Sequence, residues 1–309
     1  MTPPFITADA VAGQLDWLAV ADAIAAGHRG PRAALGDLFL SEGGDTVLSR
    51  AAWIPGVGMA VKTVSVLPGN PAEGRPTVHG AMIVFDGATG AVRAVIDSAL
   101  VTRWKTAADS ILGARLLARP DATRLLIVGT GSVAESLTEA YPAAFPGIEI
   151  EIWGRTPAKA AALAARTGAR AVDDLEAAVA RADIVATATM ARAPILEGAW
   201  LRPGQHLDLI GAFTAEMREV DDKALCRARI FVDSYDTTLA HIGELKDPLA
   251  RGVIARADIL GDFYALVGGA PGRRAAEDIT LFKNGGGAHL DLMTAGVILA
   301  AWERAKSQG

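Results

Sequence analysis

The sequence predicts an α/β protein in which a doubly wound, Rossmann-type parallel sheet is inserted into an α+β domain with an antiparallel meander. From Arg124 onward, short apolar strands alternate with helical stretches, a pattern typical of a parallel sheet covered on both faces. The strand-like runs before that point are joined by turns too short for crossover helices. A final helix outside the alternation indicates that the chain returns to the first domain.

Composition indicates a compact globular chain. The 309 residues, 51% hydrophobic and 21% charged, suffice for two domains. A net charge of −5 with scattered basic residues disfavours nucleic acid as a partner. The single cysteine excludes an intramolecular disulfide, and no spacing of metal ligands is seen. Because neither a signal peptide nor a long apolar run is found, we expect a cytoplasmic protein that does not enter membranes.

The first third of the chain predicts a helix followed by a meander. Apolar residues at helical spacing mark residues 14–28. A long helix is predicted over 99–119 and ends at Pro120. Between these helices, strand-like runs are separated by segments rich in Pro and Gly. The runs are TVLSRAAW, GVGMAVKTVSVL, AMIVFD and AVRAVID.

The strands of the alternating region define a second domain. We predict that residues 120–283 bind a dinucleotide, and that 1–119 and 284–309 form a substrate-binding and dimerisation domain closed by a helix at about 288–306. The apolar strands of the second domain are RLLIVGTG, EIEIWG, DIVATAT, HLDLIGA and RIFVDS.

A phosphate-binding turn follows the first of these strands. In VGTGSVAES, Gly129, Gly131 and Ala134 fit the pattern G-x-G-x-x-A. The first glycine allows a tight turn, the second lets a pyrophosphate approach the backbone, and the small third residue lets helix and strand pack closely. Ser132 and Val133 would present free N–H groups at the helix N-terminus. The sequence therefore predicts a dinucleotide site.

The end of the second strand bears on the choice of nicotinamide cofactor. An NAD-preferring site usually has an acidic residue there, which binds the ribose 2′-hydroxyl. This chain has Gly154, Arg155 and Thr156 instead, with Lys159 nearby. Arg155 could pair with a 2′-phosphate, or it could be a solvated loop charge. We predict NADPH, with NADH also accepted.

Lys62 is the outstanding residue of the meander. Strand alternation places it on one face with Ala60 and Val64, and the opposite face is also largely apolar. A buried lysine there would cost several kcal/mol unless it is paired or binds an anion. The alternative is a lysine near a sheet edge whose amine reaches solvent. On the next helix, Lys105 and Asp109 are four residues apart and could form a surface pair.

Six stretches resemble, in order, the ornithine cyclodeaminase/μ-crystallin family, and the likeness covers nearly the whole chain. The resemblance implies a substrate and dimerisation domain with the nucleotide domain inserted into it, and a homodimer. The stretches are the strand with Lys62, PGNPAEGRPTVHG (68–80), DSALVTRWKTAADS (97–110), GTGSVA (129–134), LIGAFTAEMREVDD (209–222) and DITLFKNGGGAHLD (278–291).

The resemblance also implies where a substrate carboxylate is held. The implied anchors are Arg32, Lys62 and Lys105, and Lys62 would also act as the catalytic residue beside the reacting C=N bond. Lys105 stands where the family usually has arginine, so the bidentate fork of a guanidinium is lost. Thr106 would touch the nicotinamide end of the cofactor.

A second departure concerns Phe213. Ornithine cyclodeaminases have an aspartate at or beside this position, which handles the amino groups of the substrate. Phenylalanine cannot bind an ammonium group, and GAFT resembles the Δ1-pyrroline-2-carboxylate reductases instead. Asp208, inside the preceding strand, is the alternative acid. We expect His289, at the start of the last helix, to serve as a cap or in packing.

The function implied is NADPH-dependent reduction of a cyclic imine carboxylate. The expected reaction converts Δ1-pyrroline-2-carboxylate to L-proline, and the six-membered homologue to L-pipecolate. One alternative is an ornithine cyclodeaminase or another amino-acid dehydrogenase. The other is a non-catalytic, NADPH-dependent binding protein of the μ-crystallin type.

Overall fold

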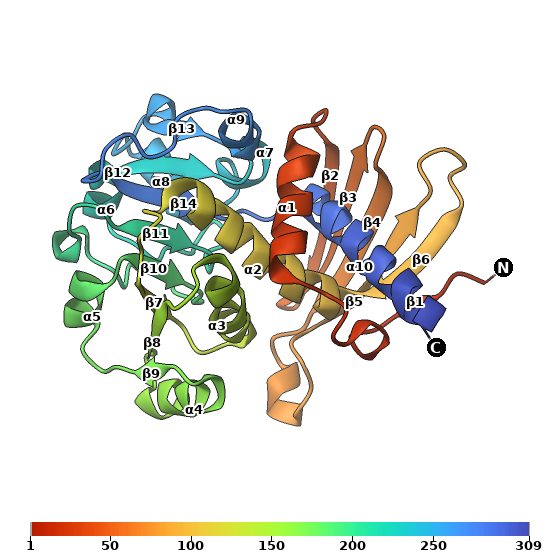
Figure 1. Ribbon diagram of the computed structural model, residues 1–309, viewed down its shortest axis with the longest axis horizontal. Helices are drawn as coiled ribbons and strands as arrows, with labels where there is room; N and C mark the ends of the chain where they lie inside the picture. The colour runs from red at the N-terminus through yellow and green to blue at the C-terminus, as the bar shows by residue number, and fades with distance from the viewer. Residues whose placement is uncertain (1, 309) are drawn as a thin grey trace. The chain divides into compact units, whose positions relative to one another are not determined.

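The computed structural model describes residues 2–308, which form two compact units (Figure 1). One unit contains the residues up to Lys105 and those from Gly287 onward, and the other is Thr106–Gly286. The chain therefore begins in the first unit, builds the second as an insertion and returns to the first.

The predicted and observed division points differ at the long helix α2 (Ser98–Leu117). The sequence predicts a boundary after residue 119, at the end of this helix, whereas the compact units divide between Lys105 and Thr106, inside it. A continuous helix carries no turn signal at that point, so the sequence offers nothing that would locate the division there.

The first unit is built on a six-stranded sheet in the order β1-β6-β5-β4-β3-β2, antiparallel except for the parallel pair β1 and β6. The four predicted strands are β3 to β6. The short β1 and the edge strand β2 were not predicted; β2 is exposed along nearly its whole length and lacks a buried face that would mark it as a strand. The bounds are β1 Phe5–Ile6, β2 Ala34–Glu42, β3 Asp45–Ile54, β4 Gly58–Val66, β5 Val78–Phe85 and β6 Val92–Asp97.

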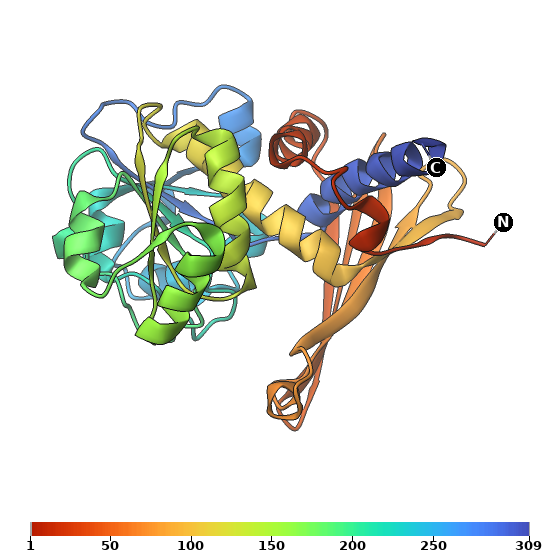
Figure 2. The same cartoon turned by 60° about the horizontal axis from the view of Figure 1, so that its bottom comes forward.

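Two helices from opposite ends of the chain pack together in this unit. The last helix, α10 (Ala288–Gln308), packs on β3 and β4, and α1 (Trp17–His28) packs on α10 (Figures 1 and 2). The helices approach so closely at Gly27 that a Cβ there would lie 2.5 Å from Met293. Both helices were predicted; short 3₁₀ helices are η1 (Asp9–Val11) and η2 (Asn70–Glu73).

The second unit is an eight-stranded, all-parallel sheet in the order β13-β12-β14-β11-β10-β7-β8-β9. This confirms the predicted Rossmann-type sheet. Its strands are β7 Arg124–Val128, β8 Glu149–Trp153, β9 Arg170–Ala171, β10 Ile184–Thr187, β11 His206–Leu209, β12 Ala228–Val232, β13 Ile259–Gly261 and β14 Ile279–Lys283. Its further helices are α3 Ser132–Ala144, α4 Pro157–Thr167, α5 Leu175–Arg181, η3 Gly198–Trp200, α6 Asp222–Arg227, α7 Tyr235–Thr238, α8 Gly243–Ala250, η4 Arg256–Asp258 and α9 Phe263–Val267.

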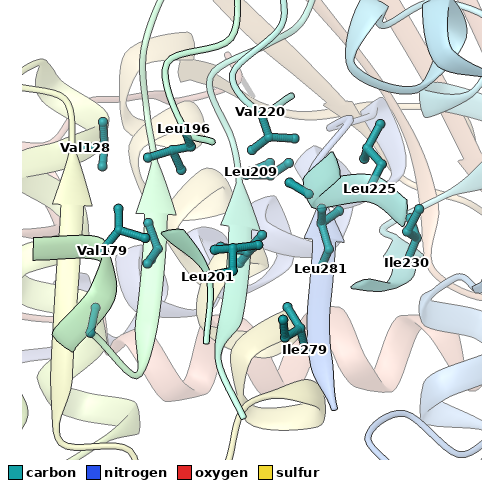
Figure 3. Close-up of a cluster of buried hydrophobic side chains, with 14 of the residues drawn as sticks. Val128, Val179, Leu196, Leu201, Leu209, Val220, Leu225, Ile230, Ile279 and Leu281 are labelled. Carbon is teal, nitrogen blue, oxygen red and sulfur yellow. The ribbon is translucent and has the colours of Figure 1, made fainter. Parts of the chain in front are cut away.

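The core of the second unit lies on the parallel sheet. Val128, Leu209 and Leu281, from three strands, pack with Val179 of α5 and Leu225 of α6 in one buried cluster (Figure 3). The central strands β10, β11 and β14 are buried at every residue, as expected for a parallel sheet covered on both faces. The buried residues of β11 and β14 include the polar His206, Asp208 and Lys283. None of the helices within residues 2–308 is long and apolar enough to span a membrane.

Candidate active site

The glycine turn after β7 forms the cradle that its sequence predicts. Gly129 has φ +139°, and a Cβ on it would lie 2.5 Å from the carbonyl oxygen of Ala188. Gly131 caps α3, and no atom lies within 4 Å of where its Cβ would be. A phosphate could therefore approach this backbone directly. Ser132 and Val133 begin α3, whose first N–H groups lack helical carbonyl partners.

A pocket lies at the carboxyl ends of β7, β8 and β10, where Rossmann folds bind ligands. The predicted residues Gly129, Gly131 and Arg155 line it, Thr156 caps α4, and Lys159 is exposed in the first turn of that helix. Ala134 is fully buried and lets α3 pack closely. The whole lining is Gly129, Thr130, Gly131, Trp153, Gly154, Arg155, Ala188, Thr189, Met190, Ala191 and Ile195. No acidic residue lines this pocket, and the backbone at Gly131 is open to the approach of a phosphate group.

A buried carboxylate that the sequence did not reveal organises one wall of this pocket. Glu219 accepts hydrogen bonds from the hydroxyls of Thr187 and Thr189 and from the backbone N–H groups of Thr189, Gly211 and Ala212, at 2.7–3.2 Å. Glu219 is fully buried. It therefore fixes the loops that follow β10 and β11, and no local motif marks it as doing so.

A second buried carboxylate, that of Glu244, holds the backbone at Glu219. Glu244 accepts from the backbone N–H groups of Glu219 and Val220, at 2.8 and 3.1 Å. Burial raises the pKa of Glu244 to about 7, with the nearby Lys283 opposing and Glu219 adding to the shift. Lys283 is itself fully buried and donates to the backbone carbonyls of Leu209 and Asn284.

Asp208, the alternative acid of the fourth predicted strand, is fully buried and held by other side chains. Ser110 and Tyr141 donate to its Oδ2, and Asn284 donates to its Oδ1. Burial raises the pKa of Asp208 to about 6, while these donors oppose the shift. Its hydrogen bonds are all made within the second unit, so we assign it a structural role. Phe213 follows in an exposed loop.

In the first unit, Lys62 is paired. Its Nζ lies 2.7 Å from Oδ2 of Asp291, and the two side chains are 11% and 1% exposed. Lys62 stands in the middle of β4, on the same face as Ala60 and Val64, as its alternation predicts. Asp291 comes from the first turn of α10. The pairing therefore depends on α10 packing on β4. The return of this helix to the first domain was predicted, but its contact with Lys62 was not.

Other cations surround this pair. In the register of the sheet, Lys62 lies opposite Arg50 of β3, which is bound to Asp37 of β2 at 2.8 Å. Burial lowers the pKa of Lys62; Asp291 opposes this shift, and Lys105 and Arg50 add to it. Burial raises the pKa of Asp291, but Lys62, Lys105 and Arg50 outweigh it and hold that pKa below its usual range.

Lys105 is almost fully buried on α2, and Asp109 is completely buried, so the surface pair predicted as one alternative is wrong. The electrostatic effect of Lys105 on Lys62 and Asp291 places it near them. Arg32 lies in an exposed segment between α1 and β2, and Arg50 rather than Arg32 shares the sheet row of Lys62. Thr106 follows Lys105 on α2 and is half-buried.

His289 belongs to the same group of side chains. It is 1% exposed, and neither ring nitrogen has a hydrogen-bond partner within residues 2–308. Burial lowers the pKa of His289 to about 3, and His28, Lys105 and Arg50 act in the same direction. The rings of His28 and His289 meet edge to face, with centroids 5.4 Å apart. His289 is therefore neutral and packs against His28, which is one of the two roles expected from the sequence; it does not cap the helix.

The protein therefore contains two polar sites. The first unit holds a buried ammonium among cations, suited to an anionic ligand, and the second holds a dinucleotide pocket. No cluster of three or more potential metal ligands occurs in the part of the chain that the structure describes. The chemistry these groups can support is electrostatic binding and proton transfer beside a nicotinamide cofactor.

The chain is similar to several known proteins over nearly its whole length. A Delta(1)-pyrroline-2-carboxylate reductase of Paracoccus denitrificans is 53% identical over 303 residues, 96% of each chain. A Thermococcus litoralis Delta(1)-pyrroline-2-carboxylate reductase, solved with NADH and L-proline, has a TM-score of 0.90 at 26% identity and covers 99% of this chain and 98% of its own. An archaeal alanine dehydrogenase dimer with bound NAD has a TM-score of 0.91 at 27% identity, covering 100% and 97%.

A family model matches residues 54–307, which include the strand of Lys62, the glycine cradle and the first turn of α10. The matched region is most of the chain. The chain belongs to the ornithine cyclodeaminase/mu-crystallin family.

Proposed function

We propose that the protein reduces Δ1-pyrroline-2-carboxylate to L-proline with a nicotinamide cofactor. The observation that carries the proposal is the buried Lys62, held by Asp291 among further cations. The Paracoccus relative bears the name of this activity, and the Thermococcus structure was solved with the product. The chain is therefore an oxidoreductase acting on a C=N bond.

The charges of the first unit fit a substrate with one carboxylate. Arg50, Lys62 and Lys105 are cationic, and Asp37 and Asp291 are anionic. Among these five side chains one positive charge is left over, and a single substrate carboxylate would neutralise it. Lys62 and Lys105 hold this carboxylate, and Arg32 adds a contact from its exposed segment. Phe213 cannot bind an ammonium group, so it fits a ring substrate that has no second amine.

The protein contributes placement and a proton. A bound nicotinamide cofactor would supply the hydride needed at C2 of the ring. Lys62, as an ammonium, keeps positive charge beside the imine and delivers a proton to the ring nitrogen, leaving a secondary amine. Burial makes this amine a better proton donor than an exposed lysine, because it lowers the pKa. Thr106, next to Lys105 on α2, contacts the nicotinamide end.

NADPH is the preferred cofactor. Gly154, Arg155 and Thr156 stand where an NAD-preferring site has an acid, and Arg155 lines the pocket with Lys159 exposed nearby. A guanidinium at this place pairs with a 2′-phosphate. NADH, which the Thermococcus structure contains, is accepted more weakly.

The protein acts as a homodimer that uses the sheet face opposite Lys62. Five exposed apolar side chains lie on this face and alternate along their strands with residues of the Lys62 face: Leu38, Leu40, Val47, Trp53 and Ile83. An apolar face of this extent is unusual on a monomer. A second copy of the chain is the occupant, as the dimeric alanine dehydrogenase of the same fold suggests.

The deciding experiment follows NADPH oxidation with Δ1-pyrroline-2-carboxylate and with its six-membered homologue, beside ammonia release from L-ornithine. We expect oxidation with the imine and no ammonia. Lys62→Ala should abolish turnover and leave NADPH binding unchanged, with exposed Lys246→Ala as the matched control. Ammonia release would establish a cyclodeaminase, whereas tight NADPH binding without turnover would establish a binding protein.

A further inference from the structure

Asp291 is the carboxylate in contact with Lys62, and it comes from a distant part of the chain. Its Oδ2 lies 2.7 Å from Nζ of Lys62, and its side chain is 1% exposed. Its other oxygen, Oδ1, has no hydrogen-bond partner within residues 2–308. The first turn of the long helix α10 carries it, where the helix dipole also favours a negative charge.

Of the charged groups that most strongly affect Lys62 within residues 2–308, Asp291 alone favours its ammonium form. Lys105 from α2 and Arg50 from β3 repel it. Asp37 of β2 is already bound to Arg50. His289 of α10 is neutral, and His28 of α1 bonds through Nδ1 to the Ile24 carbonyl at 2.7 Å.

The sheet neighbours of Lys62 on the other side do not help. On β5 the residue opposite Lys62 is Met82, which is buried and apolar. A buried amine beside two cations favours its uncharged form unless an anion is in contact. Asp291 is therefore what separates a charged lysine from a neutral one in this cluster.

We propose that Asp291 is a positioning residue that holds the Lys62 amine in its charged form and directs it at the imine. This inference rests on the proposed reductase function and deepens it. An uncharged Lys62 could neither neutralise the substrate carboxylate nor give a proton to the ring nitrogen. Asp291 acts on the substrate only through Lys62.

The inference predicts a displaced pH profile. Activity falls at high pH when Lys62 loses its proton, and in Asp291→Asn this loss should occur at lower pH by about 1–3 units, the usual effect of one contacting charge. At pH values above both limbs, kcat/KM should be reduced by about tenfold for each unit of displacement. Asp291→Glu keeps the charge, so its basic limb should stay near that of the wild type.

The imine nitrogen of the substrate also titrates and contributes to the pH profile, equally in all variants. A titration of the free imine in solution, without enzyme, measures this contribution separately, and its pKa should be the same for every variant. Exposed Asp45→Asn is the matched control and should leave the profile unchanged.

The experiment measures kcat/KM for Δ1-pyrroline-2-carboxylate from pH 6 to 10 with saturating NADPH, together with thermal unfolding and NADPH affinity. A wild-type protein without imine reduction would overturn the proposed function. An active wild type whose basic limb coincides with that of a folded Asp291→Asn would overturn this inference alone. If Asp291→Asn does not fold, the pKa of Lys62 can be measured directly by NMR in an Asp291→Ser protein that carries ¹³C-labelled lysine. A pKa lower than that of the wild type supports the inference, and an unchanged pKa overturns it.

Discussion

Thr189 donates both its backbone N–H and its hydroxyl to the carboxylate of Glu219, at 2.9 and 2.7 Å. Thr189 also lines the dinucleotide pocket. A buried carboxylate thus fixes a residue that a cofactor would touch, and the same carboxylate binds Gly211 and Ala212 after the next strand.

Glu219→Gln should weaken both folding and cofactor binding. Glutamine has one acceptor oxygen for five donors and turns its NH₂ group toward some of them, so the unfolding free energy should fall by about 3 kcal/mol. NADPH affinity should fall with it. Thermal unfolding and fluorescence titration measure the two effects, and exposed Glu216→Gln is the control. A Glu219→Gln protein that binds NADPH like the wild type would show that the pocket wall does not depend on Glu219.

Alanine substitutions at the two glycines of the cradle should have different effects on stability and cofactor binding. Gly129→Ala brings a Cβ to 2.5 Å from the Ala188 carbonyl at φ +139°, so we expect a loss of stability of about 3 kcal/mol or more. Gly131→Ala meets no atom within 4 Å, so its unfolding temperature should stay near that of the wild type.

Gly131→Ala should nevertheless weaken NADPH binding by about tenfold or more, because its methyl group occupies the approach of the pyrophosphate. Calorimetric unfolding and NADPH titration on the same samples separate the two effects. Unchanged NADPH affinity in Gly131→Ala would mean that the phosphates bind elsewhere.

Arg155→Ala should remove the preference for NADPH. Losing a charge-assisted contact to the 2′-phosphate should raise the Kd for NADPH by about 10–100-fold, while the Kd for NADH changes little. Arg202→Ala, at an exposed position outside the pocket lining, should alter neither affinity. Equal weakening of both cofactors would show that Arg155 binds a group that NADH and NADPH share.

Aspartates on the apolar sheet face should separate the dimer. We expect the wild type to have twice the chain mass of 32.0 kDa in light scattering. The double variant Leu40→Asp, Trp53→Asp should have the monomer mass, because both side chains are more than half exposed on the proposed contact face. Leu260→Asp places the same charge at an exposed apolar position of the second unit and should stay dimeric. A wild-type monomer would refute the proposed interface.

The local motifs predicted more of the second unit than of the first. A glycine turn between an apolar strand and a helix needs only neighbouring residues, so Gly129, Gly131 and Ala134 could be placed from the sequence. Lys62 could be flagged because alternation alone put a charge on a buried face. β2 could not be recognised, because both of its faces are largely exposed.

The partners of the flagged residues could not be predicted in the same way. Asp291 meets Lys62 only because the last helix packs on β4, and Glu219 meets Thr189 only across a loop. Neither Asp291 nor Glu219 belongs to a recognisable motif, and an isolated acidic residue in a sequence is usually exposed to solvent. An available signal was that His289 and Asp291 are polar residues in the mainly apolar first half of this helix.

His206 should set part of the acid sensitivity of the protein. It is fully buried in β11, its Nδ1 lies 2.9 Å from the Thr280 hydroxyl, and burial lowers its pKa to about 3. The unfolded chain regains a histidine pKa near 6.5, so it binds a proton that the folded chain refuses. The stability that neutral His206 contributes is therefore present above pH 6.5 and is lost as the pH falls toward 3, at up to about 1.4 kcal/mol per pH unit.

Asp208 and Glu244 act in the opposite sense, because their raised pKa values of about 6 and 7 make the folded chain bind protons that the unfolded chain releases. Both carboxyls are retained in His206→Gln, so the difference between variant and wild type reports the histidine. Denaturant unfolding from pH 4 to 8 should show a shallower loss of stability below pH 6.5 in His206→Gln, and no change of slope in exposed His241→Gln. Equal slopes in His206→Gln and the wild type would mean that His206 is protonated in the folded protein and that its charge is compensated there.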